Sequence, residues 1–331
     1  MAIKHPYLLF LGDAHDQLAA KTADGVAYWR PEWCLGQFRL PGCKADLKLP
    51  DMSVEAAAAA GAKTLVVGVA NRGGVVAESW IPVLTRALER GLDLAAGMHQ
   101  RLAGVPVLKA TAERLGRSIF DVRHPTQEFH VASGKPRSGK RLLTVGTDCS
   151  IGKMFTSLAL ERELRMRGAK ADFRATGQTG ILIAGEGVSV DAVVADFISG
   201  ATEWLAPASD EDHWDLIEGQ GSLFHASYAG VSLGLLHGGQ PTAIVMCHEP
   251  TRTHMRGLPG YSLPSLHECI EANLRAARLT SPTVTCVGIS INTSTLDASA
   301  ADSILKQTAD SFGLPCVDPV RTGVAAIADR L

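Results

Sequence analysis

The chain has 331 residues, a length that fits two domains better than one small domain or three. Hydrophobic residues make up 46% and charged residues 20%, a globular composition that excludes a disordered or fibrous chain. The net charge of -2 gives no basic surface for nucleic acid. No apolar run reaches about 18 residues, so neither a membrane span nor a membrane partner is expected. The first residues also lack the apolar core of a signal peptide.

Strand-like and helix-like segments alternate through the first 130 residues. The expected strands are residues 7–12, 64–69, 92–98 and 118–122, and the expected helices are 54–60 and 79–90. Such alternation predicts an α/β domain with a parallel sheet covered on both faces. The Gly/Pro-rich loop that carries Trp29, Trp33 and Phe38 has three open interpretations: an oligomer contact, a lid or ordinary core.

A stretch rich in Pro, Gly, Ser and charge, residues 131–141, is interpreted as the linker between two domains. From residue 142 to 331 the alternation resumes. The expected strands are residues 142–145, 171–175, 215–218, 243–247, 284–291 and 316–317. One expected helix follows the first of these strands and ends near residue 167, and two others span residues 266–278 and 298–312. This half is also predicted to be a parallel, doubly wound α/β domain.

Seven cysteines are spread widely along the chain, and no Cys-x-x-Cys pair occurs. This pattern favours neither zinc ligation nor a redox motif. Free thiols fit a reducing compartment, so we expect a cytoplasmic protein.

The strongest motif is a glycine loop between a buried strand and a helix. It consists of Gly146, Thr147, Asp148, Cys149, Ser150, Ile151, Gly152 and Lys153. Glycines let backbone N–H groups turn around an anion, and the helix N-terminus and the lysine add positive charge. The motif therefore predicts a phosphate-binding loop, one residue longer than the common P-loop. A structural glycine turn is the alternative.

Met154 occupies the position after Lys153 where nucleotide hydrolases place a Ser or Thr that holds Mg²⁺. A thioether is a poor ligand for Mg²⁺. We therefore expect no metal at this site, and metal-free binding of a phosphorylated carrier.

Two acidic residues are candidates for a general base. Glu218 follows an expected strand and precedes glycines, the place where parallel sheets present ligand-binding side chains, although a solvent-facing strand end is the alternative. Asp196 lies in an apolar stretch, where a charge needs either a partner or a function, so catalysis and a structural ion pair stay open.

Further polar residues follow expected strands. Arg174 is suited to a bidentate clamp on a carboxylate, or to a salt bridge, and Gln178 lies in the same run. Asn292 can read an adenine edge or make a plain turn. The three histidines in glycine- or proline-containing loops, each either structural or a base, are His225, His248 and His254.

The first half carries the run from Gly68 to Gly74, which includes Asn71 and Arg72, after a strand. It lacks the dinucleotide-binding fingerprint and the acidic residue expected downstream, so a substrate or oligomer contact is favoured over a bound dinucleotide.

The chain resembles the D-glutamate N-acetyltransferase family, formerly known only as a domain of unknown function. The resemblance extends along nearly the whole chain and rests on five runs, which are residues 65–74, 144–154, 173–181, 218–223 and 247–252. The second half is also similar to dethiobiotin synthetase-like P-loop proteins. The resemblance implies a Rossmann-like domain over residues 1–130 and a P-loop domain over 142–331.

The same resemblance implies acetyl transfer from acetyl-CoA, as co-substrate, to the amine of D-glutamate. The phosphate loop would then hold a CoA phosphate, and Glu218 or Asp196 would accept a proton from the substrate. Arg174 or Arg252 would bind a substrate carboxylate, with Gln178 and Ser222 as further substrate contacts. Backbone N–H groups of residues 219–222 would stabilise the oxyanion.

Other functions stay open. Cys149, at a helix N-terminus, is an alternative acyl-carrying nucleophile. An ATP- and Mg²⁺-dependent ligase or kinase gains support if Thr156 or an acidic residue completes a metal site. A CoA or nucleotide sensor would bind tightly without turnover, and an NAD-dependent oxidoreductase lacks its fingerprint. The expected partner is a small amino acid, and we expect a homo-oligomer.

Overall fold

The computed structural model describes residues 2–70 and 73–331, which form two compact α/β units. One unit comprises Met1–Thr126 and Gly177–Ala192, and the other comprises Gln127–Thr176 and Val193–Leu331. The sequence suggested one passage from the first domain to the second, at residues 131–141. The structure adds a segment, Gly177–Ala192, that leaves the second unit and folds with the first.

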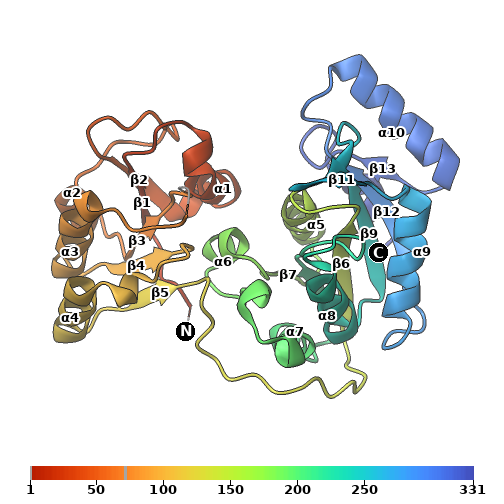
Figure 1. Ribbon diagram of the computed structural model, residues 1–331, viewed down its shortest axis with the longest axis horizontal. Helices are drawn as coiled ribbons and strands as arrows, with labels where there is room; N and C mark the ends of the chain where they lie inside the picture. The colour runs from red at the N-terminus through yellow and green to blue at the C-terminus, as the bar shows by residue number, and fades with distance from the viewer. Residues whose placement is uncertain (1, 71–72) are drawn as a thin grey trace. The chain divides into compact units, whose positions relative to one another are not determined.

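A five-stranded parallel sheet forms the centre of the first unit (Figure 1). In spatial order its strands are β2 (Cys34–Arg39), β1 (Tyr7–Gly12), β3 (Thr64–Val67), β4 (Asp93–Ala96) and β5 (Ile119–Asp121). Three helices pack along one flank of this sheet: α2 (Val54–Ala59), α3 (Ile81–Glu89) and α4 (Pro106–Leu115). Two others pack against each other: α1 (Lys21–Trp29) and α6 (Gln178–Ala184).

The loop with three aromatic residues is part of the ordinary core. Trp29 is buried, Trp33 stacks on His5 with ring centroids 4.3 Å apart, and Phe38 stacks on Phe10 at 5.8 Å. Two of these residues lie outside regular strands, but Phe38 belongs to β2, an edge strand that the sequence did not predict. The core interpretation is therefore the one that the structure supports.

In a doubly wound sheet of this order, the ligand crevice opens where the strand order reverses, between β1 and β3. Here the 3-10 helix η1 (Leu18–Ala20) and helix α1 occupy that place. A Cβ on Gly68 would lie 2.2 Å from the Cβ of Ala23, and the Ala70 N–H donates to the Ala19 carbonyl at 2.7 Å. The chain that follows β3 is therefore packed tightly against this helical segment. Asn71 and Arg72, from the same run, lie outside the described residues.

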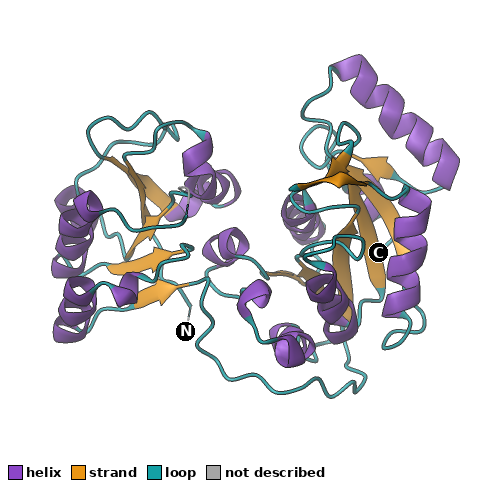
Figure 2. Cartoon of the chain, viewed as in Figure 1, coloured by secondary structure: helices purple, strands orange, loops and turns teal. Residues whose placement is uncertain are grey.

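The second unit contains a six-stranded sheet in which every neighbouring pair is parallel (Figure 2). In spatial order its strands are β13 (Cys316–Val317), β12 (Thr285–Ile291), β9 (Ala243–His248), β6 (Lys140–Gly146), β8 (Trp214–Ile217) and β7 (Ala171–Arg174). The expected α/β class is thus confirmed in both units. Because all strands run the same way, the carboxyl ends of β6, β8, β9 and β12 meet at one edge.

The helices around this sheet form two groups by their contacts. Helix α5 (Lys153–Met166) packs with α11 (Ala325–Ala328), whereas α8 (Ala229–Gly239) packs with α7 (Ile198–Leu205) and α9 (Leu266–Ala277). Helix α10 (Ala298–Phe312) packs on the edge strand β13. A small hairpin of β10 (His254–Met255) and β11 (Leu258–Ser262) follows β9.

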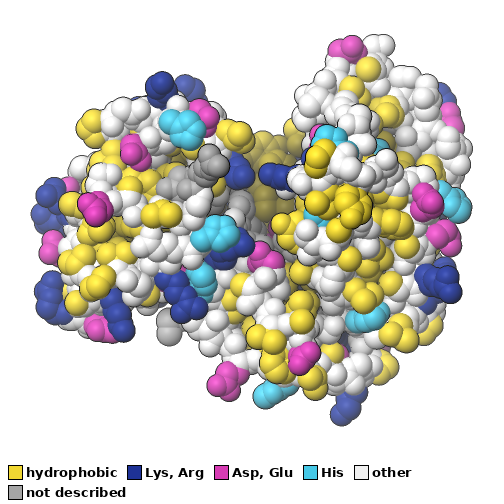
Figure 3. Space-filling model, viewed as in Figure 1, with side chains coloured by type: hydrophobic (Ala, Val, Ile, Leu, Met, Phe, Trp, Pro, Cys, Tyr) yellow, Lys and Arg dark blue, Asp and Glu magenta, His cyan; other side chains and the backbone are white. Residues whose placement is uncertain are grey.

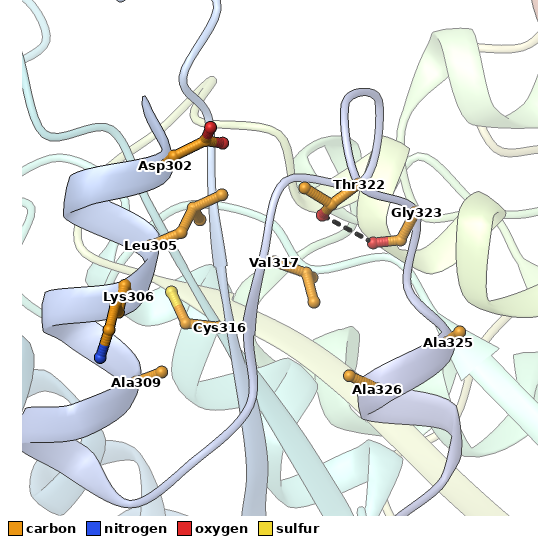
Figure 4. Close-up of a pocket in the computed structure, with 10 residues that line it drawn as sticks. All are labelled: Asp302, Leu305, Lys306, Ala309, Cys316, Val317, Thr322, Gly323, Ala325 and Ala326. Carbon is orange, nitrogen blue, oxygen red and sulfur yellow. Dashed lines mark hydrogen bonds between the residues drawn. The ribbon is translucent and has the colours of Figure 1, made fainter. Parts of the chain in front are cut away.

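A hollow of about 460 Å³ opens between α10, β13 and α11 (Figure 4). Its walls are mostly apolar, with Leu305, Ala309 and Val317 among them, and the Thr322 hydroxyl is hydrogen-bonded to the Gly323 carbonyl at 3.2 Å. In the sheet order, β13 is separated from β6 by two strands, so this hollow lies away from the strand that precedes the phosphate loop.

Charges of both signs are interspersed over each unit on the face drawn in Figure 3. This agrees with the near-neutral composition of the chain. Among the described residues, no helix has both the length and the apolar character needed to cross a bilayer.

Candidate active site

Residues 146–153 form the expected loop between a strand and a helix. Strand β6 ends at Gly146 and α5 begins at Lys153. Ser150 and Gly152 adopt left-handed φ values of 54° and 106°, the conformation that turns successive N–H groups inward. A Cβ on Gly146 would lie 2.5 Å from the Ile151 side chain, so the loop can close over β6 only with glycine at its start. The backbone therefore has the form of an anion-binding loop.

Lys153 lies inside this loop. Its side chain is buried, and its ammonium donates to the Asp148 carbonyl at 2.6 Å. Burial lowers the pKa of Lys153, and the nearby Glu218 and loop residues oppose that shift. A buried cation with spare N–H donors is stabilised by an anionic ligand, which makes this lysine the natural partner of a phosphate.

Hydrogen bonds to the Asp148 carboxylate join the phosphate loop to the segment that contains the hairpin of β10 and β11. This carboxylate accepts hydrogen bonds from the Arg252 guanidinium at 2.7 Å, the Arg256 N–H at 2.8 Å and the Cys149 N–H at 2.7 Å. Burial would raise the pKa of Asp148, but the Arg252 bond and the backbone donors outweigh it, so the pKa is lowered. Arg252 also donates to the carbonyls of Cys149 and Ser150. The structure therefore places Arg252 on the loop itself, where it holds the loop's shape.

Glu218 is brought to the same edge of the sheet. It directly follows β8, is buried, and accepts a hydrogen bond from the Thr176 N–H at 2.9 Å. Its charge acts on Lys153 across the loop. Next to it, a Cβ on Gly219 would lie 1.6 Å from the Thr144 carbonyl, so only glycine lets the chain pass. Glu218 thus lies beside the phosphate loop, at the carboxyl end of the sheet.

Asp196 is placed differently from what its apolar neighbours suggested. It is exposed, on the 3-10 helix η6 (Ala195–Phe197), and Val194, just before this helix, is exposed as well. The apolar stretch is therefore not a buried strand, and the Asp196 charge is hydrated without a partner or a function being needed.

Arg174 makes the salt bridge that was the alternative to a substrate clamp. Its Nε donates to Asp215 at 2.7 Å, and Asp215 is fully buried at the amino end of β8. Gln178 belongs to the other compact unit, on α6, where its amide oxygen accepts from Arg123 at 3.3 Å. The two residues, close in sequence, are thus held by different units.

Ser222 and Asn292 are engaged in local hydrogen bonds. The buried Ser222 hydroxyl donates to the Thr147 carbonyl at 3.1 Å, and this hydrogen bond helps to hold the phosphate loop. The Asn292 side chain accepts from the Ser294 N–H at 3.1 Å, the geometry of an Asx turn. The Gly219 N–H donates to Thr144 at 3.0 Å, so this amide, expected at an oxyanion, is already in use.

Three possible metal ligands lie close together at the loop. Atoms of Asp148, Cys149 and His225 are all within 4.8 Å of one another. However, His225 Nδ1 accepts from the Ser227 N–H at 3.1 Å, and Nε2 lies 3.0 Å from the Arg256 carbonyl, to which it donates. Both ring nitrogens of His225 and both carboxylate oxygens of Asp148 already take part in hydrogen bonds, and Arg252 and Arg256 lie close to Asp148. The cluster is therefore better described as a set of hydrogen bonds that hold the loop than as a cation site.

Thr156, one turn into α5, was the candidate that would complete a magnesium site. Its hydroxyl is buried, donates to the Gly152 carbonyl at 3.0 Å and contacts the Ser290 hydroxyl at 2.8 Å. It points into the helix–sheet interface, so it does not replace the Ser or Thr that Met154 displaces. The ligase alternative therefore loses Thr156, one of the two kinds of residue that could have completed its metal site.

The comparisons with known proteins agree with this architecture. Residues 130–328 match the model of a P-loop domain of unknown function, DUF1611_C, and residues 38–125 match the DUF1611_N Rossmann-like domain. The chain belongs to the DUF1611 family. A crystal structure of a DUF1611 family protein from Anabaena variabilis is 34% identical, with a TM-score of 0.85 over 99% of each chain.

Two curated relatives of this DUF1611 protein bear the name D-glutamate N-acetyltransferase. The protein from Tritonibacter scottomollicae is 56% identical over 99% of both chains. The protein from Pseudoalteromonas sp is 50% identical over 100% of both chains. The resemblance inferred from the sequence motifs is thereby confirmed.

One pair of residues in this DUF1611 protein escaped the sequence analysis. His248 was one of three undistinguished histidines, and Thr147 was one member of the loop. In the structure the His248 Nδ1 lies 3.0 Å from the Thr147 hydroxyl, although the two residues are 101 positions apart. The only signal in the sequence was that each directly follows or ends a buried strand.

Proposed function

We propose that this chain transfers the acetyl group of acetyl-CoA to the amine of D-glutamate, with the phosphate loop binding a CoA phosphate. The observation that carries the proposal is a phosphate loop complete for an anion but lacking its usual metal ligand. Lys153 is buried in the loop, whereas Met154 and the engaged Thr156 offer no Mg²⁺ ligand. The activity named for the two curated relatives supports the choice of donor group and acceptor.

The reaction is a direct displacement at the thioester. The substrate ammonium first loses a proton, and its nitrogen lone pair then attacks the carbonyl carbon. The C–N bond forms, the tetrahedral intermediate collapses, and the C–S bond breaks. One further amine proton passes to the departing sulfur, so the products are N-acetyl-D-glutamate, CoA thiol and one released proton.

Glu218 is the base that we assign to the first proton. It is a buried carboxylate beside the loop, whereas Asp196 is exposed on η6. For the substrate carboxylates, Arg174 and Arg252 already have buried aspartate partners. The exposed Arg256, whose backbone is fixed to Asp148, is the better candidate cation. Seven free cysteines are in keeping with a cytoplasmic location.

A thiol-release assay tests the proposal. Purified protein is mixed with acetyl-CoA and a panel of D- and L-amino acids, with EDTA and again with Mg²⁺. We expect CoA release that depends on D-glutamate and survives EDTA. If no amino acid in the panel causes CoA release and the protein instead consumes ATP in a Mg²⁺-dependent reaction, the ligase alternative would replace this function.

The role of the loop has its own variant. Lys153→Met removes the buried charge, and losing a charge-assisted hydrogen bond should raise the KM for acetyl-CoA by about 10- to 100-fold. Lys170→Met is the matched control, because Lys170 precedes β7 at the opposite edge of the sheet and pairs with Asp210. An unchanged KM for acetyl-CoA in Lys153→Met would show that the CoA phosphate does not bind in this loop.

A further inference from the structure

An exposed tyrosine lies on the segment that connects β8 to α8. The Tyr228 residue is 48% exposed, although its backbone is closely packed. A Cβ on Gly221, which has a left-handed φ of 65°, would lie 2.7 Å from the Tyr228 carbonyl oxygen. The Ser232 hydroxyl, one turn further along, donates to the Gln220 carbonyl at 2.6 Å. Tyr228 is therefore held against the glycine run that follows β8.

This glycine run borders the phosphate loop. A Cβ on Gly219, the first glycine of the run, would lie 3.0 Å from the Cδ of Lys153. Further along, the Ser222 hydroxyl donates to the Thr147 carbonyl at 3.1 Å. Strands β8 and β6 are also neighbours in the sheet, so the chain after each of them leaves the sheet at the same edge. The segment that carries the tyrosine is therefore in direct contact with the loop.

A buried histidine supports the Tyr228 ring. The ring centroid of His225, a residue that is 2% exposed, lies 4.6 Å from that of Tyr228, with the two planes tilted by 33°. Hydrogen bonds at both nitrogens fix His225, and its Nε2 lies 4.0 Å from the Asp148 carboxylate of the loop. The tyrosine ring is thus packed on a fixed ring, while nearly half of the residue stays open to a second planar group.

The adenine of CoA is a planar group of this kind. In CoA the adenine is joined through a single ribose to both the diphosphate and the 3′-phosphate, so it lies close to whichever phosphate the loop holds. The acetyl thioester, in contrast, is at the far end of the pantetheine arm. Aromatic side chains bind bases by stacking on their faces, without reading their hydrogen-bonding edges. An aromatic residue attached to the phosphate loop is therefore in reach of the adenine end of the carrier.

We propose that Tyr228 stacks on the adenine of CoA while the phosphate loop holds a CoA phosphate. The site then selects an adenine nucleotide and not a phosphate group alone. Asn292, which the sequence suggested for the adenine edge, follows β12, and β9 lies between β12 and β6. Tyr228, in contrast, belongs to the segment after β8, which pairs directly with β6. This inference rests on the proposed binding of CoA by the loop.

Calorimetric titration with three ligands tests the proposal. CoA and adenosine 3′,5′-bisphosphate carry the adenine, whereas 4′-phosphopantetheine lacks it. Tyr228→Leu removes the ring, so the Kd for the two adenine ligands should rise by about 10- to 100-fold, with no change for 4′-phosphopantetheine. Tyr228→Phe keeps the ring and should bind all three ligands like the wild type. Circular dichroism confirms that each variant is folded.

Trp204→Leu is the matched control, because Trp204 is another exposed aromatic residue of the same unit. It lies near the end of α7, which comes before β8 in the chain, and so at the opposite edge of the sheet. The Kd of this variant for CoA should equal that of the wild type.

Different results would overturn different parts of the argument. An unchanged Kd for CoA in Tyr228→Leu overturns the inference alone, and an equal loss for 4′-phosphopantetheine does so too, because Tyr228 would then only support the loop. Affinity lost in Asn292→Ala and kept in Tyr228→Leu would place the adenine at β12 instead. A wild-type protein that binds none of the three ligands overturns the inference together with the proposed role of the loop. CoA binding without acetyl transfer would overturn the proposed reaction and leave the adenine site in place.

Discussion

Cys149 shows how a residue that is reactive by position is made inert by its surroundings. It lies at the N-terminal end of α5, where a thiol pKa is usually lowered. Here burial raises the pKa of Cys149, with Asp148 acting in the same direction against the nearby cations. His225, the nearest imidazole in the cluster, accepts from Ser227 through Nδ1 and donates through Nε2. No base is positioned to activate the thiol among the residues that the structure describes, which favours direct transfer of the acetyl group.

Cys149→Ser tests this directly. We expect kcat/KM to stay within about threefold of the wild type, because direct attack does not use the side chain, whereas loss of a covalent nucleophile costs several orders of magnitude. The thiol-release assay measures the rate, and mass spectrometry of the wild type with acetyl-CoA alone checks for an acetylated cysteine. A stable acetyl adduct on Cys149 together with an inactive serine variant would establish the covalent route instead.

Among single residues, the phosphate loop was predictable and its partners were not. The glycines and Lys153 form a local motif whose conformation depends on adjacent residues, so the sequence predicts it. The contacts of Thr147 with His248 and of Asp148 with Arg252 join positions more than 100 residues apart. They depend on the order of strands in the sheet, which no single-sequence pattern reveals.

At the scale of elements, strands β7 and β8 are joined by an ion pair between the half-buried Arg174 and the buried Asp215. Arg174 donates to Asp215 at 2.7 Å, and His213 lies 3.3 Å from the same carboxylate. Asp215 is fully buried, so its charge depends on this partner. Removing one member of a buried pair leaves an uncompensated charge, which is far more costly than removing both.

Arg174→Met should therefore lower the free energy of unfolding by about 3–5 kcal/mol, measured by chemical denaturation. The double variant Arg174→Met with Asp215→Asn should recover part of that loss. For the folded fraction of Arg174→Met, we expect an unchanged KM for D-glutamate. A normal stability with a KM raised by about 100-fold would show that Arg174 clamps the substrate after all.

Elements were predicted where burial is strong. The strands β1, β6, β9 and β12 are runs of buried apolar residues, and their positions follow from hydrophobicity alone. Strand β2 was missed because it is a half-buried edge strand with Gly36 in its middle. That glycine is required, since a Cβ there would lie 2.6 Å from the Pro50 carbonyl. Gly36 indicates a loop when the sequence is read alone, but in the fold it is the point where strand β2 passes close to the backbone of Pro50.

On the scale of the whole molecule, the chain passes between the two units three times. Residues 177–192 are covalently part of the P-loop half but pack with the first unit. The Ile3 N–H donates to the Gly185 carbonyl at 2.7 Å, and Arg123 pairs with Asp191 at 3.1 Å. A Cβ on Gly97 would lie 2.9 Å from the Gln178 Cβ, so α6 lies directly against the end of β4. The first unit is therefore completed by a segment from beyond the linker.

This topology predicts the outcome of cleaving the linker. A protease recognition sequence inserted between Gly134 and Lys135, both exposed, would divide the chain after the first unit's main portion. The second fragment would still carry α6 inside the first unit. We therefore expect the two fragments to elute together in size-exclusion chromatography and to separate only in denaturant, because separation exposes the apolar surface that α6 covers.

A single-residue change sharpens that experiment. Gly97→Ala places a methyl group where Gln178 already lies, so the cut fragments should separate at lower denaturant concentration. Gly104→Ala is the matched control, since its Cβ would meet the Arg101 side chain at an ordinary 3.7 Å. Fragments that separate without denaturant would mean that α6 does not complete the first unit. Joint elution, weakened by Gly97→Ala and not by Gly104→Ala, would show that the inserted segment holds the divided chain together.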